Sequence, residues 1–422
     1  MYHCLGLAKM QAQLLGYGSV MDLAKQQHSH MMPLSEHDDE WYYLISKLTS
    51  ALQPYLPQHT KLNLEGAGAF LDHTNNNFNK LPTEAGEAHM AVLKARYEFK
   101  QTMRLDGVLQ GVVDFCDSIF GITVVEDAVC KQEGWNKNVR LLHLYQQQKE
   151  ESDKGSDHHG DNSSNENNPG IFLGSIYLDP FADAYFRTED AEELVTTRLF
   201  SRSIHQTVAP VVVMALKIRH SWDDAPIPIS WDDTRDLLYH FGMSLQLILE
   251  QLFFDVLHTT GALLCWHNTD QVLFSFTPML CLRQFMEMWI QNDGFLNRLA
   301  QLSETDEPLD EDALKLLREE LQREKALEIV NTIFLSELQR EVFEEFDPRG
   351  DETLVALQAR LAKQHLPKGN LPSSSDLSPL LAVFQEQGSE QHMSAYSSLW
   401  SELLSAMAYE TFQNTDLRDT EE

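Results

Sequence analysis

Basic residues are scarce in this chain. Lys and Arg together number 32 against 64 Asp and Glu, which gives a formal net charge of −32 at pH 7. Such a surface would repel a phosphate backbone, so the composition argues against nucleic acid as a partner. An acidic balance most often serves solubility, and a docking surface for a basic partner is the less common interpretation.

Long apolar runs and paired cysteines are also missing. No apolar run approaches the roughly 18 residues that a membrane-spanning helix needs, so no membrane span is predicted. The five cysteines are widely spaced without a Cys-x-x-Cys pair, which indicates neither a disulfide framework nor a cysteine zinc site. The N-terminus shows no signal-peptide core or Arg-rich transit character. We expect a cytoplasmic protein, or a mitochondrial or other organellar one if the N-terminus is incomplete.

What the chain does have is enough apolar sequence for a large core, 43% of 422 residues. Its most regular stretch is residues 231–254, and Ser230 followed by Asp233 is a plausible N-terminal cap for it. The apolar residues of this stretch recur at helical spacing and form one wide stripe: Leu237, Leu238, Phe241, Leu245, Ile248, Leu249 and Leu252. The pattern predicts a buried helix that starts near Asp232.

The centre of this helix, LLYHFGMSLQ, resembles the active-site helix of the thimet oligopeptidase family of zinc metallopeptidases, whose motif reads roughly L-F-H-E-F-G-H-A-L-H. In an H-E-x-x-H helix, the two His bind zinc from one face and the Glu activates a water. Tyr239, His240 and Met243 stand at those three positions here. A phenol and a thioether are poor zinc ligands, and His240 is rotated about 100° around the helix from Tyr239.

Further segments carry the same resemblance in the family's order. They are AQLLGYGS from Ala12, LGSIYLD from Leu173, the turn HTTG from His258, QFMEMW from Gln284, and AYSSLWSE from Ala395. The strand PVVVMAL from Pro210 is most similar to the mitochondrial intermediate peptidase branch.

The resemblance implies a mostly α-helical, two-lobed metallopeptidase (zincin-like) fold with a small β-sheet beside a central channel. We expect an N-terminal helical region at 1–110 and a helix with the first strand at 111–145. A disordered acidic insertion follows at 146–170. A zincin-like core with the degenerate zinc helix spans 171–310, and a C-terminal helical region, shorter than in the family, spans 311–422.

The resemblance also implies that other functional positions are lost. The family's third zinc ligand, a Glu, falls by register on Leu280. The His and Tyr that hold the substrate carbonyl and its developing oxyanion fall by register on Glu386, Gln391, Ala395 and Ser398.

Two functions are therefore open. The first is a catalytically inactive pseudopeptidase, with no catalytic residue, metal or cofactor expected, that binds a peptide or protein or serves as a structural subunit of a larger assembly. In this interpretation Met243 and Leu280 fill the vacated metal site. The alternative is an active metalloendopeptidase with zinc on relocated ligands. Asp236 and His240 lie four residues apart on one helix face, and His220, His258, His267 or Glu287 are candidates to complete that site.

Overall fold

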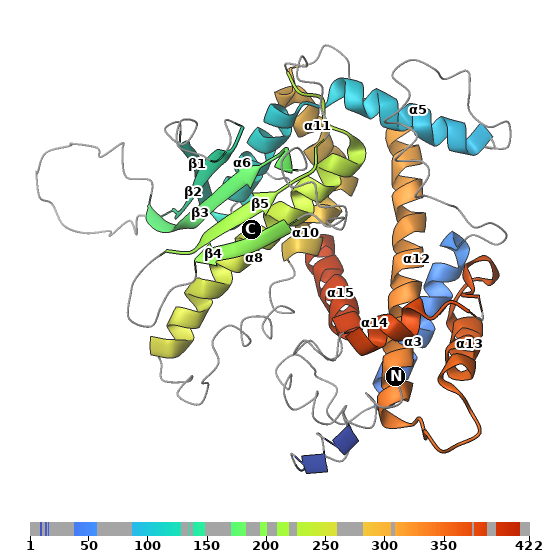
Figure 1. Cartoon of the computed structure of the whole chain (residues 1–422). Coiled ribbons are helices and arrows are strands. Elements are labelled where there is room, and N and C mark those ends of the chain that lie inside the picture. Colours follow the sequence, from blue (N-terminus) through green and yellow to red (C-terminus); the bar gives the residue numbers. More distant parts are fainter. Residues whose placement is uncertain are drawn as a thin grey trace, which may run out of the picture. The chain divides into compact units, whose positions relative to one another are not determined.

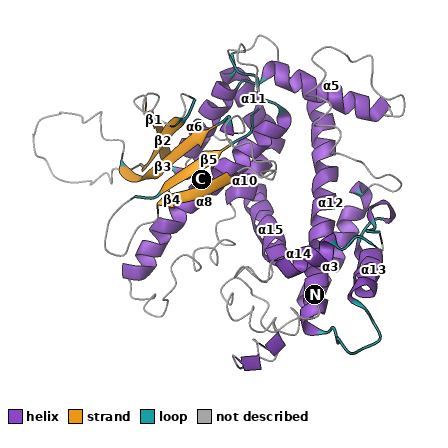
Figure 2. Cartoon of the chain, viewed as in Figure 1, coloured by secondary structure: helices purple, strands orange, loops and turns teal. Residues whose placement is uncertain are grey.

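The structure is a computed structural model of the whole chain. It describes residues 9–10, 13–14, 16, 38–56, 87–127, 135, 138–147, 170–182, 195–200, 209–218, 226–259, 282–304, 309–373, 375–385 and 394–413. Most of the expected acidic insertion at 146–170, and Leu280, lie outside these residues. The described part is mostly helical with one small sheet (Figure 2), which confirms the predicted fold class. Its helices include none that is long and apolar enough to cross a membrane.

The chain forms two compact units. The first, which we call the helical unit, comprises Met1–Ala95, Asn268–Met279 and Asp312–Leu404. The second, the sheet unit, comprises Arg96–His267, Leu280–Glu311 and Ser405–Glu422. Among the described helices, α5 (Glu87–Thr102) and α15 (Ser394–Gln413) run from one unit into the other, and α12 (Glu311–Glu344) has its first residue in the sheet unit.

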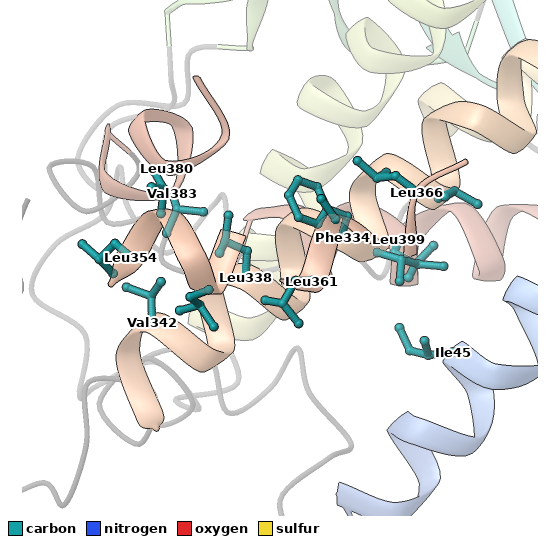
Figure 3. Close-up of a cluster of buried hydrophobic side chains, with 14 of the residues drawn as sticks. Ile45, Phe334, Leu338, Val342, Leu354, Leu361, Leu366, Leu380, Val383 and Leu399 are labelled. Atoms are coloured by element: carbon teal, nitrogen blue, oxygen red, sulfur yellow. The ribbon is translucent and has the colours of Figure 1, made fainter. Parts of the chain in front are cut away.

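The helical unit is built around one long helix. Its elements are α3 (Asp38–Leu52), η1 (Gln53–Tyr55), α12 (Glu311–Glu344), α13 (Leu354–His365), η6 (Lys368–Asn370) and α14 (Ser378–Gln385). Helix α12 contains no Pro or Gly, and its apolar stripe meets α13 and α14. The shared core includes Phe334, Leu338, Val342, Leu361, Leu380 and Leu399 (Figure 3). This burial holds the unit together, since helices of this kind gain most of their stability from an amphipathic face.

The sheet unit contains five strands and the remaining helices (Figure 1). The strands are β1 (Ile122–Asp127), β2 (Arg140–Gln146), β3 (Ile171–Asp179), β4 (Val195–Phe200) and β5 (Val211–Ala215). The helices are α6 (Leu105–Phe120), α8 (Trp231–Thr259), α10 (Leu282–Met288), η5 (Trp289–Gln291) and α11 (Asp293–Leu302). The strand order is β1-β2-β3-β5-β4; β3 and β5 run parallel and the other neighbours antiparallel.

Strand alternation decides which face of the sheet is covered. Alternate residues such as Leu144, Ile176 and Val212 are fully buried. Helices α6 and α8 lie on one face of the sheet (Figure 1), where α6 contacts β1 and α8 contacts β3 and β5. Gly174 of β3 marks the approach of α8, since a Cβ there would lie 3.2 Å from Ile248 Cγ2. The sheet therefore serves as a wall against which α8 is fixed.

Helix α10 packs against α8, and the two backbones come close together at Gly242. A Cβ built on Gly242 of α8 would lie 2.4 Å from the carbonyl oxygen of Leu282 and 2.8 Å from Arg283 Cα. Real Cβ atoms essentially never come this close to backbone, so only Gly allows the two helices to touch here.

We expect Gly242→Ala to destabilise the sheet unit by about 1–3 kcal/mol, because the new methyl group meets backbone that cannot move aside cheaply. Helix propensity alone would change stability by about 1 kcal/mol in the opposite direction. Urea unfolding followed by circular dichroism measures the change. The matched control is Gly294→Ala in α11, where the nearest heavy atom is the side-chain oxygen of Asn292 at 3.3 Å. Equal effects of the two substitutions would contradict the close approach as the cause.

Candidate functional site

Helix α8 starts with the predicted cap. The backbone N–H of Asp233 donates to Ser230 Oγ at 3.1 Å, and that hydroxyl donates to Asp233 Oδ2 at 2.6 Å. The helix then buries five residues of the predicted stripe, Leu237, Leu238, Phe241, Leu245 and Ile248, at 0% exposure. Leu249 is partly exposed, and the side chain of Leu252 lies outside the described residues. The cap sets where the helix begins, and the stripe sets which residues turn away from the core.

The opposite stripe of α8 is partly exposed, and it carries two of the three motif positions. Asp232, Asp236, Tyr239, Met243 and Leu247 all retain intermediate exposure. Their spacing of three and four residues places them on one face of the helix. His240, in contrast, is buried at 9% exposure. The residues that replace the two zinc-binding His therefore share the accessible face, and the residue that replaces the Glu does not.

Two side-chain contacts link α8 to α10, and each contains one arginine. Arg235 Nε lies 3.4 Å from Glu287 Oε1. One turn further along α8, the Arg283 guanidinium lies over the Tyr239 ring, with Cζ 5.8 Å from the ring centroid. Together with the contact of Gly242 on Leu282, these pairs show that α10 runs antiparallel to α8.

Burial controls the protonation of two side chains on α8. The pKa of Asp236 is raised to about 6, mainly by burial; Arg235 lowers it, and Asp233, Asp232 and Glu287 raise it further. The pKa of His240 is lowered to about 4 by burial. Near neutral pH, His240 is therefore a neutral imidazole, and Asp236 is ionised at an energetic cost. Within the described residues no hydrogen bond joins Asp236 to His240.

The two motif positions on the accessible stripe do not offer the ligands that zinc prefers. Zinc prefers imidazole, thiolate and carboxylate ligands, whereas these two positions hold the phenol of Tyr239 and the thioether of Met243; the stripe also carries the carboxylates of Asp232 and Asp236. The Arg283 guanidinium stacked on Tyr239 adds a positive charge where a dication would bind. Among the described residues there is no group of three His, Cys, Asp or Glu side chains that could hold a metal.

Several of the predicted positions cannot be placed at this site. Leu280, His220, His267, Glu386 and Gln391 lie outside the described residues. Three others fall on helices at positions whose side chains are not described: His258 on α8, and Ala395 and Ser398 on α15. Of the residues proposed as relocated ligands, the structure describes Asp236, His240 and Glu287, and Glu287 is the ion-pair partner of Arg235.

Sequence reasoning missed the two arginines. Arg235 precedes Tyr239 by four residues, and Arg283 precedes Glu287 by four. Each pair therefore shares one helix face. That spacing is visible in the sequence, but a metal-ligand motif does not indicate it, because a guanidinium has no acceptor atom to offer a metal.

Comparison with known proteins supports the resemblance found in the motifs. The family model Peptidase family M3 matches residues 1–422. No curated protein sequence matches the chain.

We expect Asp236→Asn to stabilise the protein more as the pH rises. Since the folded-state pKa of about 6 is above the ordinary 3.8, the folded state binds more protons between these values, and wild-type stability from this group falls as the pH rises through them. The amide of the variant does not titrate and so does not lose stability in this way. The free energy of unfolding of Asp236→Asn relative to wild type should therefore rise by about 1–2 kcal/mol from pH 4 to pH 7.

Urea unfolding of both proteins at several pH values measures this difference. The lowered pKa of His240 changes stability in the opposite direction, rising from pH 4 to 6.5, but it is common to both proteins and cancels in the comparison. Asp351→Asn, at an exposed position, is the control. If the stability difference between Asp236→Asn and wild type does not vary with pH, burial does not raise the pKa of this carboxyl.

We expect Arg235 and Glu287 to be energetically coupled. Each single substitution to Met leaves one charge partly buried without its partner and should cost about 2–4 kcal/mol, whereas the double substitution should cost less than the sum. A double-mutant cycle by urea unfolding gives the coupling energy. The control cycle uses Arg298 and Asp114, an ion pair at 2.9 Å with side chains 51% and 33% exposed, for which coupling below about 1 kcal/mol is expected. Equal coupling in both cycles would contradict a special role for the α8–α10 pair.

Proposed function

Because the chain belongs to peptidase family M3, we propose that it is a catalytically inactive member, a pseudopeptidase that acts as a peptide-binding or structural subunit. The family is ordinarily zinc-dependent, and its chemistry needs a metal to activate water and polarise a carbonyl. The proposal therefore depends on what stands at the metal-binding positions of α8 and α10 in this chain.

The observation that carries the proposal is the guanidinium of Arg283 over the ring of Tyr239. Tyr239 stands at the register of the first zinc-binding His, and its ring face is covered by a permanent cation. Zinc bound at this position would lie beside that charge, and the phenol would give little in return.

The general base is missing as well. His240 stands at the register of the Glu that would activate water, yet it is 9% exposed and turned away from the accessible stripe. Its lowered pKa makes the imidazole a weak base. The positions for the carbonyl-binding side chains hold Glu386, Gln391, Ala395 and Ser398, so oxyanion stabilisation would be lost together with the metal.

One observation favours the alternative of relocated zinc. The lowered pKa of His240 keeps its imidazole neutral, which is the form that binds metals. The set of proposed ligands argues against a relocated zinc site, since Asp236 and His240 differ in exposure and Glu287 is paired with Arg235. We therefore retain relocated zinc as the outcome that would replace the proposal.

We expect purified protein to contain far less than one zinc per chain and to leave a mixed library of internally quenched peptides uncleaved. Elemental mass spectrometry and fluorescence measure these, with an active zinc oligopeptidase as the positive control for the assay. A chelator should leave the melting temperature unchanged, since no metal holds the fold together.

The double variant Asp236→Ala, His240→Ala separates the two functions. Under the proposal its metal content and its lack of cleavage match those of wild type. If wild type instead carries near-stoichiometric zinc with chelator-sensitive cleavage, and the double variant loses both, relocated ligands are the correct assignment and the proposal is wrong.

A further inference from the structure

We propose that Arg283 and Tyr239 form a carboxylate-binding site, and that this site receives an acidic group of a bound peptide. This assignment rests on the proposed function, which it deepens by naming the ligand chemistry of the former metal site. The acidic group is either the C-terminal carboxylate of the peptide or an Asp or Glu side chain. Both present a carboxylate, and matched peptides distinguish them.

The first step is the state of the Arg283 guanidinium. Its Nε donates to Gln284 Oε1 at 3.3 Å, and its face lies over Tyr239. Within the described part of the chain, Arg283 forms no ion pair with a carboxylate. The chain has two acidic residues for every basic one, 64 against 32, so a partly exposed arginine that forms no ion pair with the described residues is unexpected. No described residue bonds to its two Nη groups, and we assign them to the ligand.

The second step is geometry. Stacking uses the face of a guanidinium, whereas hydrogen bonds use its edge, so contact with Tyr239 and binding of a carboxylate are compatible. The edge of an arginine matches the two oxygens of a carboxylate in a bidentate pair. Because Gln284 is buried at 4% exposure and Tyr239 holds the guanidinium from one side, Arg283 would lose little side-chain freedom on binding.

The third step is competition from nearby acids. Glu287 lies one turn along α10 from Arg283, but its carboxylate is paired with Arg235 at 3.4 Å. The close contact of Gly242 with Leu282 and Arg283 fixes this arrangement, since α10 cannot slide along α8 without a clash. Arg235 therefore neutralises Glu287, and Arg283 is kept for an outside ligand.

The overall negative charge does not prevent this binding. At 0.15 M salt the Debye length is about 8 Å, so charges elsewhere on the surface are largely screened, and a direct contact decides the local preference. The site differs in kind from a zinc centre, because it takes an anion as ligand and repels a metal cation.

Fluorescence anisotropy with two matched pairs of peptide libraries tests the assignment. The first pair consists of mixed octapeptides without Asp or Glu, carrying a neutral dye and ending in either a free carboxylate or an amide. The second pair consists of amidated octapeptides with a central Glu or Gln. We expect the acidic member of one pair to bind about tenfold or more tightly than its neutral match, as a charged hydrogen-bonded pair would give.

The variants assign the preference to the site. Arg283→Gln should abolish it, Arg283→Lys should retain only part because the fork is lost, and Tyr239→Phe should keep it because the ring remains. Arg298→Gln removes the same charge from the exposed surface of α11 and should leave the preference intact. Melting curves show which variants are folded, and Arg283→Lys decides the question if Arg283→Gln is not.

Several results would overturn the assignment: no binding of any library, equal binding of acid and neutral peptides, or an acid preference that survives in folded Arg283→Gln or stays complete in Arg283→Lys. These results leave the pseudopeptidase proposal standing. That proposal is tested by the zinc content of the protein and by peptide cleavage, which are measured without any of these peptides.

Discussion

The approach of α10 to α8 at Gly242 is the constraint on which the candidate site depends. With no room for a Cβ between the two backbones, the register of one helix against the other is fixed at a single residue. That register places Glu287 beside Arg235 and Arg283 over Tyr239. The sheet determines the other side of α8, because the buried stripe packs against it and leaves Tyr239 and Met243 on the accessible face.

This packing creates an electrostatic requirement. Glu287 is 7% exposed, and a carboxylate so deeply buried needs a cation to offset its desolvation. Arg235 supplies that cation. Within the residues that the structure describes, Asp236 forms no ion pair, and burial with three neighbouring carboxylates outweighs the effect of Arg235 and raises its pKa to about 6. Arg235 therefore offsets part of the acidic environment formed by Glu287 and Asp236.

The elements with strong local signals were predictable from sequence, and those set by distant contacts were not. Ser230, Asp233 and the apolar stripe were enough to predict α8, and the resemblance indicated a strand at PVVVMAL from Pro210, where β5 lies. Strand β1 (ITVVED) begins directly after the helix cap Gly121, and β4 (VTTRLF) is a polar edge strand, so neither has a clear pattern of its own. The stacking of Arg283 on Tyr239 joins residues 44 positions apart, and it follows from the helix register rather than from any motif.

Under the proposed function, side-chain and backbone contacts rather than a metal join α8 to α10. Zinc binds its ligands at about 2.0–2.3 Å around one point, so losing a single ligand breaks the junction. The contacts between α8 and α10 are longer and distributed over three levels: an ion pair at 3.4 Å, a ring contact at 5.8 Å, and backbone packing at Gly242. Under the proposed function, such a junction would hold the helices together without a metal. Because its positive charge is carried by side chains with hydrogen-bond donors, the same proposal would suit this helix pair to receiving anions rather than to activating water.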